Sequence, residues 1–170
     1  MSTSRALISV EEYLSTVYEE GDCDYVDGEV LDRAVGTRDH SWFQGMLAAY
    51  FIARRKEWNI TILPEIHIRV SATRYRIPDL AILLGDTDEQ ILTKPPFLCI
   101  EILSPEDRWS RVESRINDFL KMGVAYVWVI DPQTRQIYVA TAAAGLHEVK
   151  DGVLRTSNPE FCVALDELYA

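Results

Sequence analysis

Apolar and polar positions along the chain follow two different periods, and these periods mark the expected helices and strands. Between residues 39 and 58, apolar residues recur in pairs every four positions, which predicts a helix with one buried face. Asp39 is the expected N-cap of this helix. Residues 111–122 have the same helical spacing, and Gly123 follows as the residue that ends the helix. The chain therefore has two long helices with one apolar face each.

Two short signals near the N-terminus predict smaller elements. Ser9 and Glu12 have the spacing of a capping box, which predicts a short helix that begins directly after Ser9. Asp27 and Gly28 stand between β-favouring residues, and this pair is a signal for the turn of a hairpin. Glu29 comes directly after the expected turn.

Five segments have the patterns of β-strands. Residues 60–62 and 66–70 alternate apolar and polar positions, the period of strands with one buried face. Residues 80–84 form an apolar stretch, and 97–103 and 125–130 are more continuously apolar, which predicts central strands covered on both faces. The second long helix stands between the last two segments, so we expect a right-handed crossover that joins them as parallel strands.

The C-terminal part predicts further strands. Residues 136–140 are expected to return as an antiparallel partner of the last central strand, and residues 146–170 as one more short strand pair with a turn at Asn158. The length of 170 residues falls within the size of a single domain, and no internal repeat or linker interrupts the chain. The sequence therefore predicts a single domain over residues 1–170.

The composition is that of an ordinary globular protein, with 48% hydrophobic and 26% charged residues. The three cysteines are far apart and odd in number, so they form neither a disulfide framework nor a paired-thiolate zinc site. The N-terminus lacks the apolar core of a signal peptide, and no apolar run approaches the roughly 20 residues of a membrane helix. We therefore expect a soluble, cytoplasmic protein with no membrane partner.

The formal net charge of -10 argues against a dedicated nucleic-acid binder, because affinity for a duplex comes largely from lysine and arginine. An enzyme can still bind a polyanion through a local basic patch and a divalent metal, and the carboxylates of a metal site themselves add negative charge. The net charge therefore restricts nucleic-acid binding to a local site.

Two carboxylates stand in apolar strand segments. Asp79 begins one such segment, and Glu101 interrupts another. A lone carboxylate among apolar residues is costly to bury unless it is paired, hydrogen-bonded or bound to metal. Two of them on neighbouring strands suggest a site for a hard cation. The alternative is an aspartate that faces water and a glutamate that is salt-bridged to an arginine, and the spacing leaves both readings open.

The order of several short motifs resembles a known group of enzymes. Pro78-Asp79, followed later by Glu101-Ile102-Leu103, resembles the two acidic half-motifs of the PD-(D/E)XK nucleases, the restriction-endonuclease-like superfamily. More narrowly, the chain resembles the Uma-two family of endonucleases over roughly residues 9 to 140. The motifs that carry this likeness are Asp27-Gly28-Glu29, Asp39-His40, Arg76-Ile77-Pro78-Asp79, Glu101-Ile102-Leu103-Ser104-Pro105 and the segment 123–132.

The resemblance implies a restriction-endonuclease-like fold of the α/β (α+β) class, in which helices flank a mixed β-sheet. It also implies Mg²⁺ or Mn²⁺ held by Asp79, Glu101 and the backbone carbonyl of Ile102. Such a cation polarises the scissile phosphate and lowers the pKa of a bound water, so that hydroxide can attack at neutral pH. The expected partner is DNA. A twofold homodimer is a further expectation, because nucleases of this kind often pair to cut both strands.

The cationic residue of the motif departs from the superfamily pattern. The motif normally ends in a lysine two residues after the glutamate, and this position is Leu103. In the narrower family the lysine lies in the following helix, and the residue that matches it is Arg115. Helical geometry places Arg115 at the edge of the apolar face, whereas Lys121 projects to the far side. Arginine stabilises charge on a phosphate oxygen but cannot act as a general base, so we expect weakened or lost activity.

Three further residues are candidates for the site. Glu29 matches an extra acidic residue of the family, as a catalytic group or a ligand of a second metal. His40, at the start of the first long helix, is a candidate contact for a phosphate or the substrate. The alternatives are a solvated hairpin carboxylate and a solvated histidine. Glu65 faces away from its apolar neighbour Ile66 and is a further candidate for the same cleft.

These observations lead to one principal hypothesis and two alternatives. The principal hypothesis is a metal-dependent endonuclease that acts on DNA. The first alternative is a catalytically silent interaction or nucleic-acid-binding module that kept the fold after losing the lysine, and binding of a divalent metal distinguishes the two. The second takes Asp79 and Glu101 as the acid and base of a glycosidase, which leaves the ordered motifs unexplained.

Overall fold

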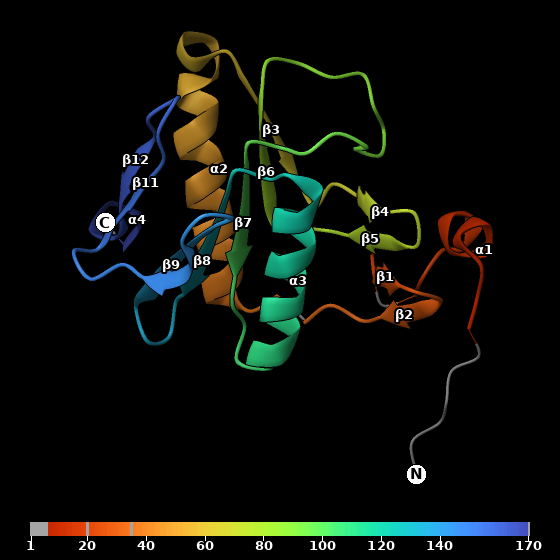
Figure 1. The fold of residues 1–170 in the computed structure, drawn as a ribbon. Helices are drawn as coiled ribbons and strands as arrows, with labels where there is room; N and C mark the ends of the chain where they lie inside the picture. The colour runs from red at the N-terminus through yellow and green to blue at the C-terminus, as the bar shows by residue number, and fades with distance from the viewer. Residues whose placement is uncertain (1–6, 20, 35, 170) are drawn as a thin grey trace.

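A mixed β-sheet forms the centre of the computed structural model, which describes residues 7–19, 21–34 and 36–169. Within these ranges, six strands pair in the order β10-β9-β8-β7-β6-β3 (Figure 1). β7 and β8 are parallel, as the sequence predicts, and the other neighbours are antiparallel. The strands are β3 (Ile60–Pro64), β6 (Leu80–Leu84), β7 (Leu98–Ile102), β8 (Tyr126–Asp131), β9 (Gln136–Thr141) and β10 (Gly145–Glu148).

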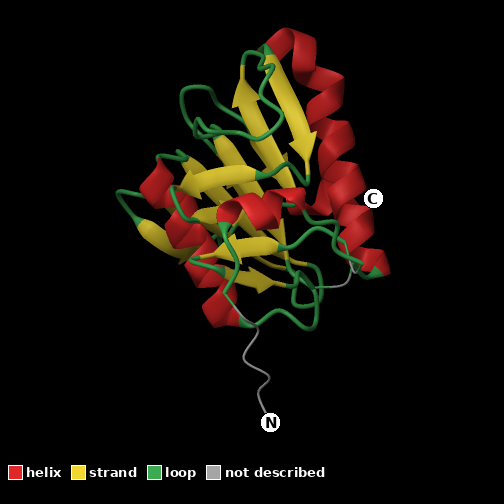
Figure 2. Ribbon diagram, turned by 90° about the vertical axis from the view of Figure 1, so that its right-hand side faces the viewer, coloured by secondary structure: helices red, strands yellow, loops and turns green. Residues whose placement is uncertain are grey.

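Two long helices cover the two faces of this sheet (Figure 2). On one face, Leu47 packs in a cluster with Ile100 of β7. On the other face, Phe119 packs in a cluster with Cys99, the next residue of the same strand. Burying each large apolar side chain contributes about 1.5–3 kcal/mol, so both layers stabilise the central strands. The helices are α2 (Arg38–Trp58), which carries Leu47, and α3 (Trp109–Met122), which carries Phe119.

The ends of the long helices follow local capping rules, with one correction to the prediction. The N-cap of α2 is Thr37, not Asp39, and the Thr37 hydroxyl accepts a hydrogen bond from the His40 backbone N–H at 3.3 Å. Asp39 lies in the first turn instead, where a negative charge suits the positive end of the helix dipole. Gly123 ends α3 with a φ of 110°, as the sequence predicts.

A smaller four-stranded sheet lies beside α3, in the order β2-β1-β5-β4 (Figure 1). Asp27 and Gly28 form the predicted hairpin turn between β1 and β2, with φ values of 50° and 100°. The alternating segment at 66–70 contributes β4, which pairs with β5. The short helix α1 is capped by Ser9, as expected, and packs on this sheet through Tyr13. The elements are α1 (Val10–Ser15), β1 (Asp24–Val26), β2 (Glu29–Leu31), β4 (Ile68–Ser71) and β5 (Arg74–Arg76).

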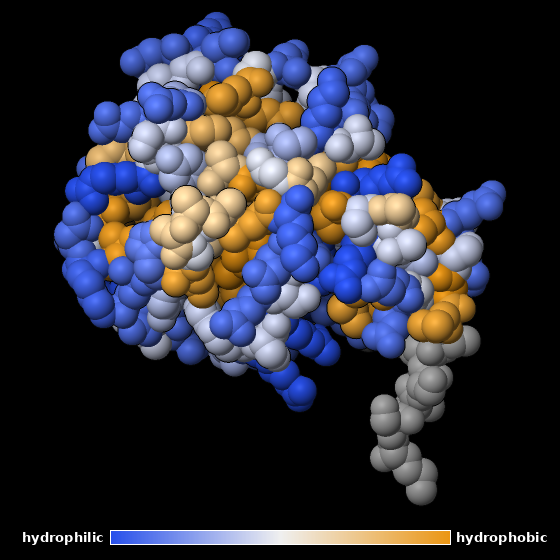
Figure 3. Space-filling model, viewed as in Figure 1, coloured by the Kyte–Doolittle hydropathy of each residue, from blue (hydrophilic) through white to orange (hydrophobic). Residues whose placement is uncertain are grey.

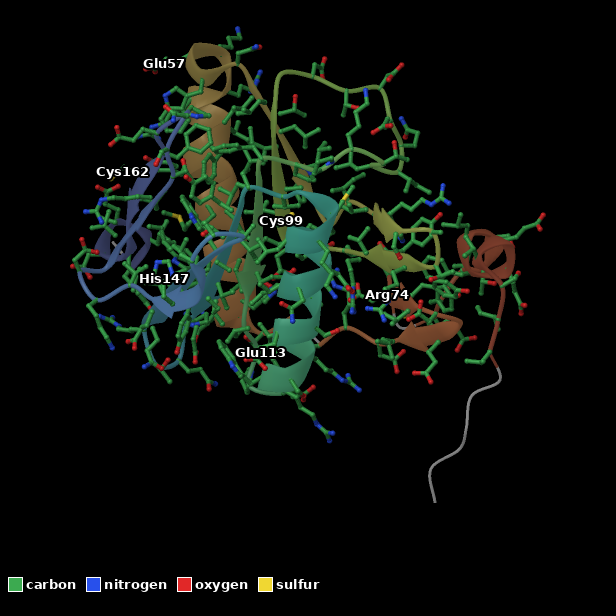
Figure 4. All side chains as sticks on the ribbon, viewed as in Figure 1. Glu57, Arg74, Cys99, Glu113, His147 and Cys162 are labelled. Atoms are coloured by element: carbon green, nitrogen blue, oxygen red, sulfur yellow. The ribbon has the colours of Figure 1, made fainter. Side chains whose placement is uncertain are left out.

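Arg76 joins the smaller sheet to α3 through a buried network. Its guanidinium donates to Asp118 of α3 at 2.7 Å, to Asp24 of β1 at 3.1 Å and to Ser114 at 3.0 Å. Arg74, labelled in Figure 4, donates to the other carboxylate oxygen of Asp118 at 2.9 Å. Because Asp24 and Asp118 are buried, their charges depend on these arginines for compensation.

Replacing Arg76 by alanine should lower the free energy of unfolding by about 3–5 kcal/mol, because the buried carboxylates of Asp24 and Asp118 would each lose a charged partner. Urea denaturation followed by circular dichroism would measure the change. Arg69→Ala is the matched control, since Arg69 is exposed on the adjacent strand β4. Equal losses for the two variants would show that the network does not hold the smaller sheet against α3.

The C-terminal segment extends the sheet and closes the α2 side of the core. The expected strand pair is present as β11 and β12, but β10 joins the central sheet and a short helix ends the described chain. Phe161, Leu165 and Leu168 pack into the cluster beneath α2. None of the helices in the described ranges is long and apolar enough to cross a membrane. The remaining elements are β11 (Val153–Arg155), β12 (Cys162–Ala164) and α4 (Leu165–Tyr169).

Candidate active site

The structure brings Asp79 and Glu101 together on neighbouring strands. Asp79 directly precedes β6, and Glu101 lies in β7. Leu80 pairs with Ile100, and continuing this antiparallel register by one residue places Asp79 opposite Glu101 on the same face of the sheet. This is the face that α3 covers, where Cys99 also packs (Figure 4). Both carboxylates are 4% exposed, and both line one cavity of about 20 Å³.

The oxygens of both carboxylates already have partners within the chain. Arg33 donates to Oδ1 of Asp79 at 2.8 Å, and Nε2 of His40 lies 3.1 Å from the same oxygen. The backbone N–H of Ile102 donates to Oδ2 at 2.7 Å. Nη2 of Arg115 lies 3.0 Å from Oε1 and 2.7 Å from Oε2 of Glu101. Glu101 is therefore salt-bridged to an arginine, as the alternative reading of the sequence has it, but Asp79 is buried and does not face water as that reading also requires.

The two carboxyl groups differ in how readily they ionise. Burial raises the pKa of Glu101 to about 8, and this effect outweighs the opposing influence of the positive charge of Arg115. Burial also acts to raise the pKa of Asp79, but the hydrogen bond and charge of His40 and the charge of Arg33 bring it below its ordinary value. Asp79 is thus the carboxylate whose negative charge the site stabilises best.

The pKa of His40 reflects the same interaction with Asp79. Burial acts to lower the pKa of His40, but its hydrogen bond to Asp79 and the charge of that carboxylate raise the pKa above its ordinary value. His40 and Asp79 therefore stabilise each other in their charged forms. A positive charge beside Asp79 is what this local environment favours.

The donor set suits a hard divalent cation. Carboxylate oxygens are the ligands that Mg²⁺ and Mn²⁺ prefer, and Asp79 and Glu101 supply them from one buried cavity. In the described ranges, no group of three or more His, Cys, Asp or Glu side chains is arranged to hold a metal ion. These two side chains could thus supply two ligands, and Mg²⁺ commonly takes its others from water or substrate phosphates. A cation at these oxygens also requires Arg33 and Arg115 to withdraw.

The remaining residues predicted from the sequence divide into two groups. Arg115 and His40 line the cavity with the two carboxylates. Glu29 does not: it is exposed, and it pairs with Val26 at the turn end of the hairpin. Asp24 lies on the same face at the other end of this hairpin, where it is buried, with Oδ2 3.6 Å from Nε of Arg115. The end of the hairpin away from its turn thus lies at the site, so the structure brings Asp24 close to Arg115 and leaves Glu29 outside the cavity.

Several residues of the site were not found by sequence reasoning. Arg33 follows β2 and contacts Asp79, and Nη1 of Arg33 also lies 3.7 Å from the exposed Glu65. No periodic pattern marks Arg33, because its partner is distant in the sequence. An acidic residue directly before Tyr25 was a usable signal for Asp24, since it repeats the pattern that singled out Asp79.

The mixed sheet between two helices, with paired carboxylates on adjacent central strands, defines a restriction-endonuclease-like protein. A model of the family described as "Uma2: Putative restriction endonuclease" matches residues 10–165, and the chain belongs to this family. This confirms the family that the motif order predicted. The chain is also similar to a solved structure from Anabaena variabilis, described as "a putative nuclease belonging to DUF820". The two share 20% identity over 95% of this chain and 97% of the other, and the TM-score of 0.82 shows a common fold. A comparison with curated proteins gives no match.

Proposed function

We propose that this protein is a metal-dependent endonuclease that hydrolyses phosphodiester bonds of DNA. The observation that carries the proposal is the pair of buried carboxylates, Asp79 and Glu101, which face one cavity from neighbouring strands. The description of the family as restriction endonucleases and of the solved structure as a nuclease supports the same class of reaction. A twofold homodimer belongs to this proposal, because two copies would cut the two strands of a duplex.

The chain's own residues would position the reaction. Asp79 and Glu101, with the backbone carbonyl of Ile102, would hold Mg²⁺ or Mn²⁺, which supplies a Lewis acid for the phosphate and a lowered pKa for water. The Ile102 backbone N–H on Oδ2 and His40 beside Oδ1 fix the orientation of the Asp79 carboxylate. Arg115 is placed to stabilise negative charge on a phosphate oxygen, whereas it stays protonated and takes no proton from water.

A second candidate function rests on the arginines. Arg33 and Arg115 already form ion pairs with the two carboxylates, so their negative charge is compensated without a metal cation. On this reading the protein is a silent module that binds nucleic acid or another protein and has lost cleavage. The two functions differ in one property, which is the affinity of the carboxylate pair for a divalent cation.

Millimolar Mn²⁺ or Mg²⁺ should raise the melting temperature of the protein, because a ligand that binds only the folded state stabilises it. The gain is about 2.7 kcal/mol at a free concentration one hundred times Kd. Differential scanning fluorimetry across a Mn²⁺ titration would measure the rise, and Asp88→Asn is the control because Asp88 is an exposed carboxylate. An unchanged melting curve for the wild type would favour the silent module.

A further inference from the structure

The N-terminal end of α3 lies beside the candidate site. The helix begins with Arg108 as its N-cap, which makes no side-chain capping hydrogen bond, and no acidic residue stands in its first turn. Helix N-termini leave backbone N–H groups without partners and have a partial positive charge. Such an end binds an anion when other positive groups surround it.

Three arginines follow one face of this helix towards the carboxylates. Arg108, Arg111 and Arg115 are spaced so that they project from the same side of α3. All three line a cavity of about 270 Å³, and Arg33 and Arg115 line both this cavity and the smaller one at Asp79. Figure 3 shows hydrophilic side chains gathered at the N-terminal end of α3, which is the lower end of the helix in this view.

The two outer arginines, Arg108 and Arg111, form no ion pair with the residues that the structure describes. Both are exposed, whereas Arg115 pairs with Glu101. Positive charges one turn apart on a helix repel each other, so this pair costs stability unless an anion lies between them. The arrangement therefore points to a negatively charged ligand at the mouth of the cavity.

The buried hydroxyl of Ser104 is an independent observation that points to a ligand. The residue is 7% exposed and lines the carboxylate cavity, and within the described ranges its buried hydroxyl makes no hydrogen bond. Ser104 belongs to the turn before α3. Its backbone N–H donates to Oδ2 of Asp107 at 2.7 Å and so closes this turn. A buried hydroxyl without a partner costs about 1–3 kcal/mol, so such groups normally pair with water or a ligand.

We infer that the cavity between residues 32–34 and the first turn of α3 binds a phosphate group of a nucleic-acid strand. Arg108 and Arg111 hold the phosphate in this cavity, and Ser104 donates to the same strand where it reaches the adjoining cavity at Asp79. Arginine suits this task, because its planar fork matches two phosphate oxygens at once. The inference rests on the proposed function, since it places the strand next to the carboxylate pair.

Acidic residues on the same cavity limit the strength of this site. Asp24 is paired with Arg76 at 3.1 Å. Glu106 and Asp32 also line the cavity, so they oppose a polyanion that enters it. Binding should therefore be weak, and it should depend steeply on salt, because much of the affinity comes from release of counterions by the arginines.

Fluorescence anisotropy of a labelled single-stranded oligodeoxynucleotide, with EDTA present to prevent cleavage, would test the site. The double variant Arg108→Gln/Arg111→Gln should bind at least about tenfold more weakly. The slope of log affinity against log salt should fall by roughly one per arginine removed.

Ser104→Ala should also weaken binding without unfolding the protein, because alanine occupies less space than serine. The matched control is Arg55→Gln/Arg155→Gln, which removes two exposed arginines from α2 and β11.

Competition identifies the source of the phosphate. A deoxynucleoside monophosphate should displace the oligonucleotide at lower concentration than inorganic phosphate does, because it carries the sugar of the strand as well as the phosphate. Equal affinity of the double variant and its control would overturn the inference, as would binding of inorganic phosphate without binding of the oligonucleotide. These outcomes are separate from the proposed function, which fails instead if Mn²⁺ leaves the melting curve unchanged.

Discussion

Replacing Asp79 by asparagine should slow DNA cleavage by about a thousandfold or more. Metal ions contribute several kcal/mol to phosphoryl chemistry, and each 1.36 kcal/mol corresponds to about a factor of ten in rate. Asparagine keeps the size of the side chain and one oxygen, so Oδ1 can still meet Arg33, but the negative charge that attracts the cation is lost. The same variant should abolish the rise in melting temperature with Mn²⁺.

Cleavage of supercoiled plasmid and of single-stranded DNA, each with Mg²⁺ and with Mn²⁺, would measure this effect. Glu101→Gln should be equally inactive, because it removes the other carboxylate of the pair. Asp88→Asn should cut at the wild-type rate, since Asp88 is exposed and lines neither cavity of the site. An Asp79→Asn enzyme that retains full activity would exclude the carboxylate pair as the catalytic centre.

Replacing Arg115 by alanine should have two large effects. Cleavage should slow by about 10²–10³-fold, the usual effect of removing one group that stabilises transition-state charge. The protein should also lose about 3–5 kcal/mol of unfolding free energy above pH 8, where Glu101 would be charged and buried without its partner. The rate should therefore be measured well below the melting temperature of the variant, and the affinity for Mn²⁺ should be measured beside it.

Arg115→Lys separates the catalytic effect from the structural one. Lysine keeps a positive charge beside Glu101 and returns the compact ammonium that the superfamily motif supplies, so cleavage should equal or exceed that of the wild type. Cleavage by Arg115→Ala at the wild-type rate would show that this residue has no catalytic part. An inert wild type combined with an active Arg115→Lys variant would identify a nuclease disabled at one position.

The fold was predictable wherever one period continued for several turns or strands. The helical stripes of α2 and α3 have such a period, and the segments of β7 and β8 are apolar over almost their whole length; all four elements lie where the sequence places them. The short helix α4 was missed, because a helix of five residues is too short for a period to show. Its position depends instead on Leu165 and Leu168, which pack beneath α2.

The sequence predicts the two central carboxylates of the site but not the residues around them. Asp79 and Glu101 stand out because a carboxylate interrupts or begins an apolar strand, and such a position is costly without a partner. Arg33 carries no comparable signal, since an arginine in a loop is ordinary until the fold brings it against Asp79. Glu29 was assigned from the order of motifs, and motif order does not say which end of a hairpin reaches the site.

Arg33 lies between two carboxylates, 2.8 Å from buried Asp79 and 3.7 Å from exposed Glu65. A divalent cation that entered the site would displace two guanidinium groups, and it would also displace the proton that the raised pKa of Glu101 favours near neutral pH. Binding of the cation would then free Arg33 to pair with Glu65 and Arg115 to contact a phosphate. Metal and substrate would consequently bind with positive cooperativity, each raising the affinity for the other by the same factor.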